Sequence, residues 1–274
     1  MRERDLQLPD GGTLHCYDSE SGGLPVFWQH GTPNVGEPPV PLEEAAQRLG
    51  VRWVSFDRPG YGGSSPQPDR TLGSTADWVQ AVATELELDR FAFMGHSGGS
   101  SHALAAAARL PGQTRAVVSV AALAPFDAAG LDWFSGMAPA GVAGLTAAAA
   151  GRAAKEEHEA SADAPPAFTE ADVAMFSGPW RWLGSVAGRG MANGPDPLID
   201  DDLAYVRPWG CAPADISVPV LLVHGDQDEI VPAAHSRWLA QQVPGAELWL
   251  QPGDGHISVL STAESALRWL VEHA

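Results

Sequence analysis

Residues 91–99 read Phe91-Ala92-Phe93-Met94-Gly95-His96-Ser97-Gly98-Gly99, an apolar run that meets a glycine-rich turn around a serine. The run predicts a short buried strand, and the small residues from Ser100 to Leu110 predict a helix directly after the turn. Gly-x-Ser-x-Gly between a strand and a helix indicates a nucleophile elbow, which exposes a serine hydroxyl above the edge of a sheet. Glycines at both ends of the turn remove the Cβ atoms that would collide there. Ser97 is therefore the candidate nucleophile.

A phosphate-binding turn is the alternative interpretation of this motif. Phosphate loops between a strand and a helix carry Gly-x-x-x-x-Gly-Lys or Gly-x-Gly-x-x-Gly, and the turn after residue 94 matches neither pattern. The sequence therefore favours a nucleophilic serine over a phosphate site.

Short apolar runs without polar alternation recur on both sides of the elbow. Such runs are typical of parallel strands that are buried on both faces, and helical segments separate them here. The runs are Val26–Trp28, Arg52–Phe56, Phe91–Met94, Ala116–Leu123, Val218–Val223 and Ala246–Leu250, and the helical segments are Pro41–Leu49, Ser74–Leu88, Ser100–Leu110, Ala233–Gln242 and Thr262–Glu272. Residues 6–17, which turn at Pro9-Asp10-Gly11-Gly12, predict an opening hairpin. The pattern predicts an α/β fold built on a parallel sheet.

The alternation of strands and helices is lost between Phe126 and about Cys211. This segment is rich in Gly, Ala and Pro, contains four tryptophans and has no convincing buried strand. We therefore predict one α/β core of residues 1–126 and 211–274, interrupted by a mainly helical insertion over residues 127–210.

A serine hydroxyl needs a base to take its proton and a third group to orient that base. In a fold of this kind the acid and then the histidine follow the serine along the chain. The strand Val218–Val223 leads into a turn with two candidate acids, Asp226 and Asp228. Asp226 lies closer to the strand end and is expected to support the turn through backbone hydrogen bonds. We therefore predict Asp228 as the acid.

Of nine histidines, His256 is the candidate base. It follows the last expected strand, precedes the last helix and has Gly253 and Gly255 beside it. Such a loop lies at the same sheet edge as Ser97 and Asp228. A surface position is the alternative for a lone histidine on a loop, but the chain order and the glycines favour the catalytic role.

Acyl transfer also requires hydrogen-bond donors for the oxyanion that develops in the transition state. The first is the backbone N–H of Gly98, the residue after the candidate nucleophile. The loop after the strand Val26–Trp28 reads His30-Gly31-Thr32-Pro33. Because proline has no N–H, Thr32 is the candidate for the second donor. The alternative is that this loop merely ends the strand.

The formal net charge of the 274 residues is -18, and the basic residues include a single lysine, Lys155. Such a chain repels nucleic-acid phosphates and anionic membranes, and no basic cluster offsets the repulsion. Hydrophobic residues make up 45% and charged residues 18%, which is the balance of a globular protein. We therefore expect neither a nucleic acid nor a membrane as a partner.

Two cysteines, Cys16 and Cys211, are too few for a disulfide framework and lack metal-ligand spacing. The first residues are charged, so no signal peptide is visible, and no apolar run is long enough to span a bilayer. We expect a cytoplasmic protein that requires no metal and no organic cofactor.

Together these motifs resemble the α/β-hydrolase superfamily, and the resemblance covers nearly the whole chain. The matching motifs, in order, are His30-Gly31-Thr32-Pro33, Asp57-Arg58-Pro59-Gly60-Tyr61-Gly62-Gly63-Ser64, Gly95-His96-Ser97-Gly98-Gly99, His224-Gly225-Asp226-Gln227-Asp228 and Gly255-His256. The resemblance implies a mostly parallel eight-stranded sheet with an antiparallel first hairpin, helices on both faces and a helical cap (lid) at the insertion. The motif at 57–64 is expected to be a structural turn.

The resemblance also implies a Ser97–His256–Asp228 triad with oxyanion donors at Thr32 and Gly98. Relatives that hydrolyse epoxides or carbon–halogen bonds carry an aspartate nucleophile, so Ser97 argues against both activities. We expect a serine hydrolase, an esterase-like member with a cap, that cleaves a carboxylic ester or lactone through an acyl-enzyme.

Other activities use the same triad, and the fold does not choose among them. They are cleavage of carbon–carbon bonds in diketones, hydrolysis of amides or N-terminal peptide bonds (amidase or aminopeptidase), and perhydrolysis. An amidase would need an amine site, for which Glu37 and Asp127 are the candidates. A member that binds a ligand without turnover is the alternative from a different class.

The insertion is expected to set specificity for a small neutral or apolar ester-like substrate. Candidates for the pocket wall are Trp133, Phe134, Met137, Phe176, Trp180 and Trp182. The alternative for each of them is packing within the small core of the insertion itself.

Overall fold

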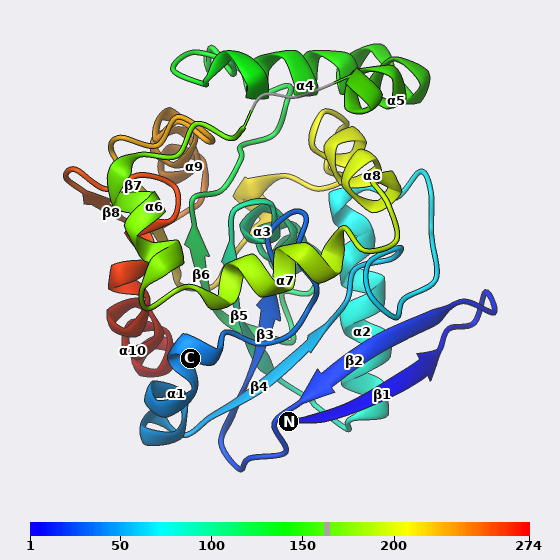
Figure 1. The fold of residues 1–274 in the computed structure, drawn as a ribbon. Helices are drawn as coiled ribbons and strands as arrows, with labels where there is room; N and C mark the ends of the chain where they lie inside the picture. The colour runs from blue at the N-terminus through cyan, green and yellow to red at the C-terminus, as the bar shows by residue number, and fades with distance from the viewer. Residues whose placement is uncertain (162–164) are drawn as a thin grey trace.

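The computed structural model describes residues 1–161 and 165–274, and an eight-stranded sheet forms its centre (Figure 1). The strands are β1 (Arg2–Gln7), β2 (Thr13–Asp18), β3 (Leu24–Gln29), β4 (Val51–Phe56), β5 (Phe91–His96), β6 (Thr114–Val120), β7 (Val220–Gly225) and β8 (Glu247–Gln251). Their order across the sheet is β1-β2-β4-β3-β5-β6-β7-β8. β2 pairs antiparallel with β1 and β4, and every other pairing is parallel. The predicted fold, a mostly parallel sheet with an antiparallel first hairpin, is confirmed.

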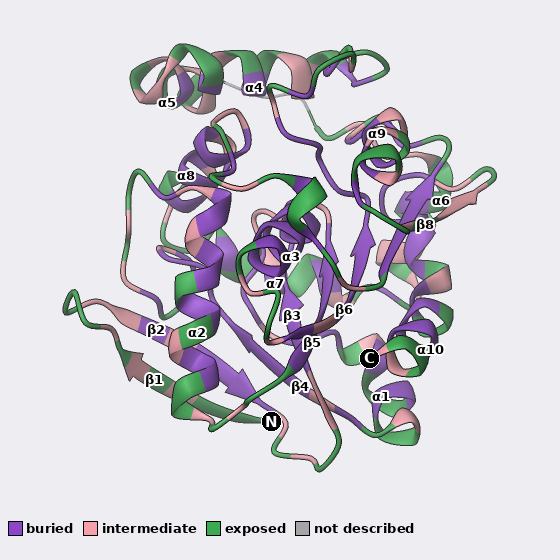
Figure 2. Ribbon diagram, turned by 180° about the vertical axis from the view of Figure 1, so that it is seen from behind, coloured by how far each residue is buried: buried purple, intermediate pink, exposed green. Residues whose placement is uncertain are grey.

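Helices cover both faces of this sheet. The helices are α1 (Glu43–Leu49), α2 (Thr75–Glu85), α3 (Gly98–Arg109), α4 (Pro139–Ala150), α5 (Arg152–Ser161), α6 (Glu170–Ser177), α7 (Trp182–Gly190), α8 (Asp196–Tyr205), α9 (Ala234–Gln242) and α10 (Ala263–His273). α2, α3 and α9 pack in one apolar cluster, and α1 and α10 pack in a second one on the opposite face. Figure 2 shows the inner strands buried between these layers, with the outer sides of the helices exposed.

The side chains of β5 show how both faces of the sheet are filled. Phe91 and Phe93 belong to the cluster that contains α3, whereas Ala92 and Met94 belong to the cluster of α1 and α10. Successive side chains of a strand point to opposite faces, so a strand with helices on both sides has no polar positions. This is why the run before the elbow is apolar without alternation.

Two helices near the site have boundaries that differ from the sequence-based prediction. α3 begins at Gly98 rather than at Ser100, because the chain turns at Ser97 and the helix follows without a linker. α2 ends at Glu85 rather than at Leu88. Glu87 has a φ of 54°, in the left-handed region, which an α-helix does not tolerate.

Residues 127–210, which we call the insertion, lie between β6 and β7 and carry helices α4 to α8. The helices α4, α5 and α8 lie over the end of the sheet toward which the arrows of β3 and β6 point (Figure 1). They therefore face the carboxyl ends of the parallel strands. The described residues of the insertion contain no strand. That these boundaries mark a separate cap stays a prediction.

Polar and apolar contacts join the helices of the insertion. The single lysine, Lys155 in α5, is buried, and its Nζ lies 2.6 Å from Glu159 Oε1 in the same helix and 2.6 Å from Asp202 Oδ2 in α8. Ile199 and Leu203 of α8 pack on Ala148 of α4. The helices α4, α5 and α8 of the insertion thus share a small core of their own.

Candidate active site

Ser97 lies at the sharp turn between β5 and α3. Its φ of 57° and ψ of −133° form a combination that residues with a side chain rarely adopt. Its N–H donates a hydrogen bond of 2.8 Å to the carbonyl oxygen of Val120, which ties the turn to β6. A Cβ atom at Gly99 would lie 2.1 Å from the carbonyl oxygen of Gln29, so only glycine fits there. The turn therefore presents the Ser97 hydroxyl at the N-terminus of α3, where the helix dipole favours negative charge.

Hydrogen bonds join Ser97, His256 and Asp228 in a line. The distance from His256 Nε2 to Ser97 Oγ is 2.8 Å, and the distance from His256 Nδ1 to Asp228 Oδ2 is 2.7 Å. The Ser97 residue is half-buried, whereas His256 and Asp228 are buried. These are the two contacts that a catalytic base makes, one with the nucleophile whose proton it takes and one with the acid that orients it.

The Asp228 carboxylate is held in place from several sides. Its Oδ1 accepts hydrogen bonds of 2.9 Å from the N–H groups of Ile230 and Val231, and His224 Nε2 lies 3.3 Å from its Oδ2. Burial by itself would raise the pKa of this carboxyl, but the charge of His256 and hydrogen bonds from His224 and His256 hold the pKa well below its ordinary value. Asp228 is therefore a carboxylate that can stabilise an imidazolium.

The other acid of the same turn, Asp226, has a different environment. Its Oδ1 accepts hydrogen bonds from the N–H of Gly253 at 2.8 Å and from Gln227 Nε2 at 3.0 Å, and the side chain is exposed. The hydrogen bond from Gly253 lowers its pKa. Asp226 thus ties the turn after β7 to the turn after β8.

The two predicted oxyanion donors come from different segments of the chain. Gly98 is the first residue of α3, so its N–H has no acceptor within the helix. Thr32 lies on the loop after β3, and its Oγ1 is 2.6 Å from the hydroxyl of Tyr205 in α8. That hydroxyl in turn lies 1.8 Å from the point where a Cβ of Gly98 would be. Thr32, Gly98 and Tyr205 therefore meet at one point above the sheet.

The loop that carries Thr32 is fixed by Arg58, from the motif expected to be only a structural turn. Arg58 Nη1 donates to the carbonyl oxygen of His30, and Nη2 donates to Thr32 Oγ1 at 3.1 Å. Nη2 also donates to Asp201 Oδ2 of α8 at 2.6 Å, and both side chains are completely buried. Sequence reasoning missed this link between the loop of Thr32 and the insertion, because nothing near residue 201 indicates a contact with residue 58.

His96, inside the elbow, is a second residue whose role the sequence did not indicate. Its Nε2 donates a hydrogen bond of 3.0 Å to the main-chain oxygen of His256. Burial, together with a smaller effect of the charge of His256, lowers the pKa of His96 to about 3. The ring is therefore neutral, and it holds the backbone of the loop that carries His256.

The six residues predicted for the pocket wall fall into two groups. Trp133, Phe134 and Met137 pack with the cluster that contains α3, whereas Phe176, Trp180 and Trp182 pack with the opposite cluster. Trp133 Nε1 donates to the carbonyl oxygen of Ala124, so this ring is anchored next to the end of β6. Their role in a substrate pocket stays a prediction.

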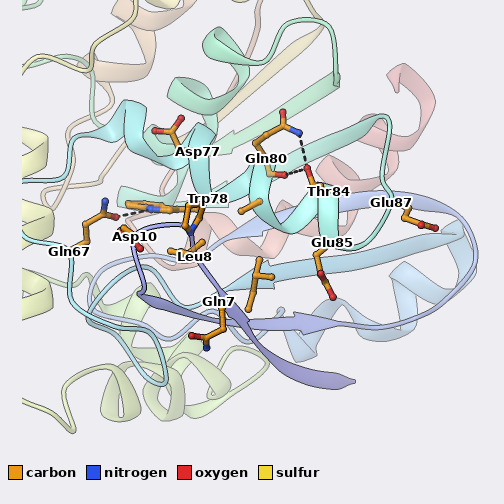
Figure 3. Close-up of a pocket in the computed structure, with 13 residues that line it drawn as sticks. Gln7, Leu8, Asp10, Gln67, Asp77, Trp78, Gln80, Thr84, Glu85 and Glu87 are labelled. Carbon is orange, nitrogen blue, oxygen red and sulfur yellow. Dashed lines mark hydrogen bonds between the residues drawn. The ribbon is translucent and has the colours of Figure 1, made fainter.

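A groove of about 850 Å³ lies elsewhere on the molecule, between the β1–β2 turn and α2 (Figure 3). Its lining combines the apolar side chains of Leu8 and Trp78 with the carboxylates of Asp10, Asp77 and Glu85. Ser97, Asp228 and His256 are not among the residues that line this groove. The groove is therefore separate from the candidate active site.

Three further observations concern metals, membranes and thiols. Within residues 1–161 and 165–274, no group of three or more His, Cys, Asp or Glu side chains is arranged to hold a metal ion. In the same residues, no helix combines the length and the apolar character needed to cross a membrane. Cys16 and Cys211 are both free thiols, and burial raises the pKa of Cys16 to about 12 and that of Cys211 to about 11.

Comparison with known proteins identifies the family. A family model described as the alpha/beta hydrolase fold matches residues 25–263. The chain belongs to the α/β hydrolase fold family. The mostly parallel eight-stranded sheet with its antiparallel first hairpin is the feature of this α/β hydrolase that its sequence predicted.

Several named proteins are similar to this α/β hydrolase. It is 30% identical to 2-hydroxymuconate semialdehyde hydrolase of Pseudomonas putida, over 97% of this chain and 92% of that protein. It is 26% identical to the non-heme chloroperoxidase CPO-A1 of Kitasatospora aureofaciens, over 88% and 87%. The structure of a thermophilic esterase from Thermogutta terrifontis superposes with a TM-score of 0.72 at 21% identity and covers all of both chains, which is a likeness of fold. The likeness to a named hydrolase over nearly the whole chain supports hydrolysis as the general activity.

Proposed function

We propose that this α/β hydrolase is a serine hydrolase that cleaves a carboxylic ester or a lactone through an acyl-enzyme. The observation that carries the proposal is a pair of hydrogen bonds: the Ser97 hydroxyl donates to His256 Nε2 at 2.8 Å, and His256 Nδ1 donates to Asp228 Oδ2 at 2.7 Å. Serine is a weak nucleophile until a base takes its proton, and this arrangement supplies the base together with the group that orients it.

Acylation begins when Ser97 Oγ attacks the carbonyl carbon of the substrate and His256 Nε2 takes the hydroxyl proton. Asp228 stabilises the imidazolium that forms, and its low pKa keeps it ionised while it does so. The N–H groups of Thr32 and Gly98 stabilise the oxyanion, a contribution of about 3 kcal/mol for each donor. His256 then gives its proton to the leaving alcohol oxygen, and the acyl group remains on Ser97.

Deacylation uses the same groups with water as the nucleophile. His256 Nε2 takes a proton from the water molecule while the water oxygen attacks the acyl carbon. His256 then gives this proton to Ser97 Oγ as the carboxylic acid is released. In a lactone the leaving alcohol and the acid belong to one molecule, so ring opening produces a hydroxy acid. No step calls for a metal or an organic cofactor.

The insertion is proposed as a cap that selects a small neutral or apolar substrate. Its helices lie over the carboxyl ends of the strands, where ligands of open α/β sheets bind. Trp133, Phe134 and Met137 on one side, with Phe176, Trp180 and Trp182 on the other, are proposed as apolar walls. The chain's net charge of -18 disfavours an anionic substrate.

Hydrolysis of carbon–carbon bonds is the second candidate, and one comparison favours it. The likeness to 2-hydroxymuconate semialdehyde hydrolase extends over 97% of this chain. Amide hydrolysis is less well supported, because the Glu37 carboxylate, a candidate amine site, pairs with Arg189 of α7. Because the chain is similar to a chloroperoxidase, perhydrolysis is a third candidate activity to be tested on the same variants.

The test combines covalent labelling with turnover of defined substrates. A fluorophosphonate probe is expected to modify Ser97, and p-nitrophenyl esters of increasing acyl length should show a preference for short chains. Ser97→Ala should lower kcat by about 10⁶-fold, whereas Ser261→Ala, a change at an exposed serine, should leave it unchanged. Ester turnover that survives Ser97→Ala would overturn the proposed mechanism. Labelling with turnover only of a diketone would select the second candidate.

A further inference from the structure

Asp172, in α6 of the insertion, contacts the loop that carries His256. Its Oδ1 accepts hydrogen bonds from the N–H of Ile257 at 2.8 Å, the N–H of Ser258 at 2.7 Å and Ser258 Oγ at 2.9 Å. Its Oδ2 accepts from the N–H of His256 at 3.2 Å. The Asp172 residue is 1% exposed. One buried carboxylate of the insertion therefore binds three consecutive backbone N–H groups of the core.

The loop at Gly255 approaches the Asp172 carboxylate closely. A Cβ atom at Gly255 would lie 2.3 Å from Asp172 Oδ2, so the loop approaches the carboxylate as nearly as a chain without a side chain can. Burial alone would raise the pKa of Asp172, but the N–H donors of Ser258, Thr169 and Ile257 lower the pKa below its ordinary value. The group is thus an ionised acceptor.

The backbone of His256 is held on both of its polar sides. Asp172 accepts from its N–H, and His96 Nε2 donates to its carbonyl oxygen at 3.0 Å. The side chain begins between these two anchors, and its Nε2 ends 2.8 Å from Ser97 Oγ. Because both polar groups of the backbone are hydrogen-bonded, the direction of the imidazole is set by these two anchors together with Asp228.

A purely structural role for Asp172 would be to cap α6. Thr169 and Asp172 do form a capping box, with hydrogen bonds from the Asp172 N–H to Thr169 Oγ1 at 3.1 Å and from the Thr169 N–H to Asp172 Oδ2 at 3.0 Å. The cap uses only one of the donors that reach the carboxylate. The other four donors belong to residues 256–258, which lie in the core and contribute nothing to the start of α6.

We propose that Asp172 is a positioning residue of the active site, which holds the backbone of His256 and thereby directs Nε2 toward Ser97. This inference rests on the proposed function and adds to it that the insertion completes the catalytic arrangement as well as covering it. A displacement of about 1 Å in a reacting group can lower a rate by about 100-fold. The effect of losing Asp172 should therefore appear in the chemical step and not in substrate binding.

The experiment compares Asp172→Asn with Thr169→Ala. The first change weakens the hold on residues 256–258, while the second removes the other half of the same helix cap and leaves the carboxylate in place. We expect Asp172→Asn to lower kcat by about 100-fold with KM changed less than about threefold. Labelling of Ser97 by the fluorophosphonate should slow in proportion, and Thr169→Ala should change either rate less than about threefold. Equal effects of the two variants would show that Asp172 only caps the helix.

Amide hydrogen exchange gives a readout that does not depend on turnover. In Asp172→Asn, the amides of residues 256–258 should exchange faster, while those of Ile230 and Val231, which bind Asp228, keep their rates. If Asp172→Asn does not fold, Ser258→Ala removes one donor and should still slow the labelling of Ser97 severalfold. Unchanged exchange and labelling would overturn the proposal for Asp172. The Ser97→Ala result judges the proposed function separately, because exchange at residues 256–258 does not require Ser97 to react.

Discussion

Asp226 and Asp228 stand two residues apart in one turn, but only Asp228 reaches His256. Asp228→Asn keeps the shape of the side chain and removes the charge that stabilises the imidazolium, so we expect kcat to fall by about 10⁴-fold. Asp226→Asn keeps an oxygen that can accept from Gly253 and should lower kcat by less than about threefold. The measurement is turnover of a p-nitrophenyl ester by both variants at saturating substrate. A larger loss of kcat in Asp226→Asn than in Asp228→Asn would show that Asp226, and not Asp228, is the acid.

The residues that could be predicted from the sequence are those whose geometry is set by their own neighbours. Ser97 is fixed by the glycines of its turn, and Asp228 and His256 each follow a strand that has to end at the same edge of the sheet. Asp172 and Asp201 could not be predicted, because their partners lie far away in the chain. A buried carboxylate is recognisable only when the donors around it are known, and the residues next to Asp201 are two further aspartates.

α8 illustrates how one element of the insertion is attached to the core. Asp201 accepts from Arg58 Nη2 at 2.6 Å, from Arg70 Nη2 at 2.9 Å and from Tyr61 Oη at 2.9 Å, and it is completely buried. Burial by itself would raise the pKa of Asp201, but Arg58 and Arg70 hold the pKa far below its ordinary value. The carboxylate thus balances two buried guanidinium groups.

We expect Asp201→Ala to lower the free energy of unfolding by about 3–5 kcal/mol, because the Arg58 guanidinium would remain buried without an anion and Arg70 would keep only its ion pair with Asp200. Asp196→Ala, at an exposed position in the first turn of the same helix, is the matched control and should cost less than about 1 kcal/mol. Urea unfolding followed by tryptophan fluorescence measures both. A loss no larger in Asp201→Ala than in the control would mean that the network relaxes and admits water.

At the level of elements, the core strands and helices were predictable to within a few residues, whereas the helices of the insertion were not. α4 consists only of Pro, Ala, Gly, Val, Leu and Thr, so its sequence carries no polar face from which a helix could be recognised. Its position follows from contacts with α5 and α8, which the sequence does not encode locally. Tertiary packing therefore determines the insertion more than local propensity does.

Across the described part of the molecule, burial keeps four histidines neutral. Burial lowers the pKa of His96 to about 3 and the pKa values of His102 and His235 to about 4, and it lowers that of His30 well below the ordinary value. In the unfolded chain these groups take up protons below about pH 6.5. The unfolded state then binds more protons than the folded state, so stability is full above pH 6.5 and decreases as the pH falls toward 4.

Each of these histidines contributes a slope of about 1.4 kcal/mol per pH unit in that range. We therefore expect the melting temperature to fall steeply between pH 6.5 and pH 5, well before the carboxylates of Asp228 and Asp201 become protonated. Calorimetry in buffers of different ionisation heat should find about three protons taken up on unfolding near pH 5, because burial raises the pKa of Asp202 to about 6 and unfolding releases the proton held there. A melting temperature that is constant from pH 7 to pH 5 would contradict the burial of these rings as neutral groups.

The position of Lys155 makes the insertion open to measurement by a protease. An enzyme that cuts only after lysine has one site in this chain, and that site lies in α5, where Glu159 and Asp202 enclose the ammonium group. A protease needs an extended strand, so cleavage of the folded protein requires local opening of α5. We expect slow cleavage into two fragments, with a rate that rises in Asp201→Ala if α5 opens together with α8. A rate that is the same in both proteins would show that α5 opens alone. Cleavage of a single peptide bond therefore reports whether the helices of the insertion open together.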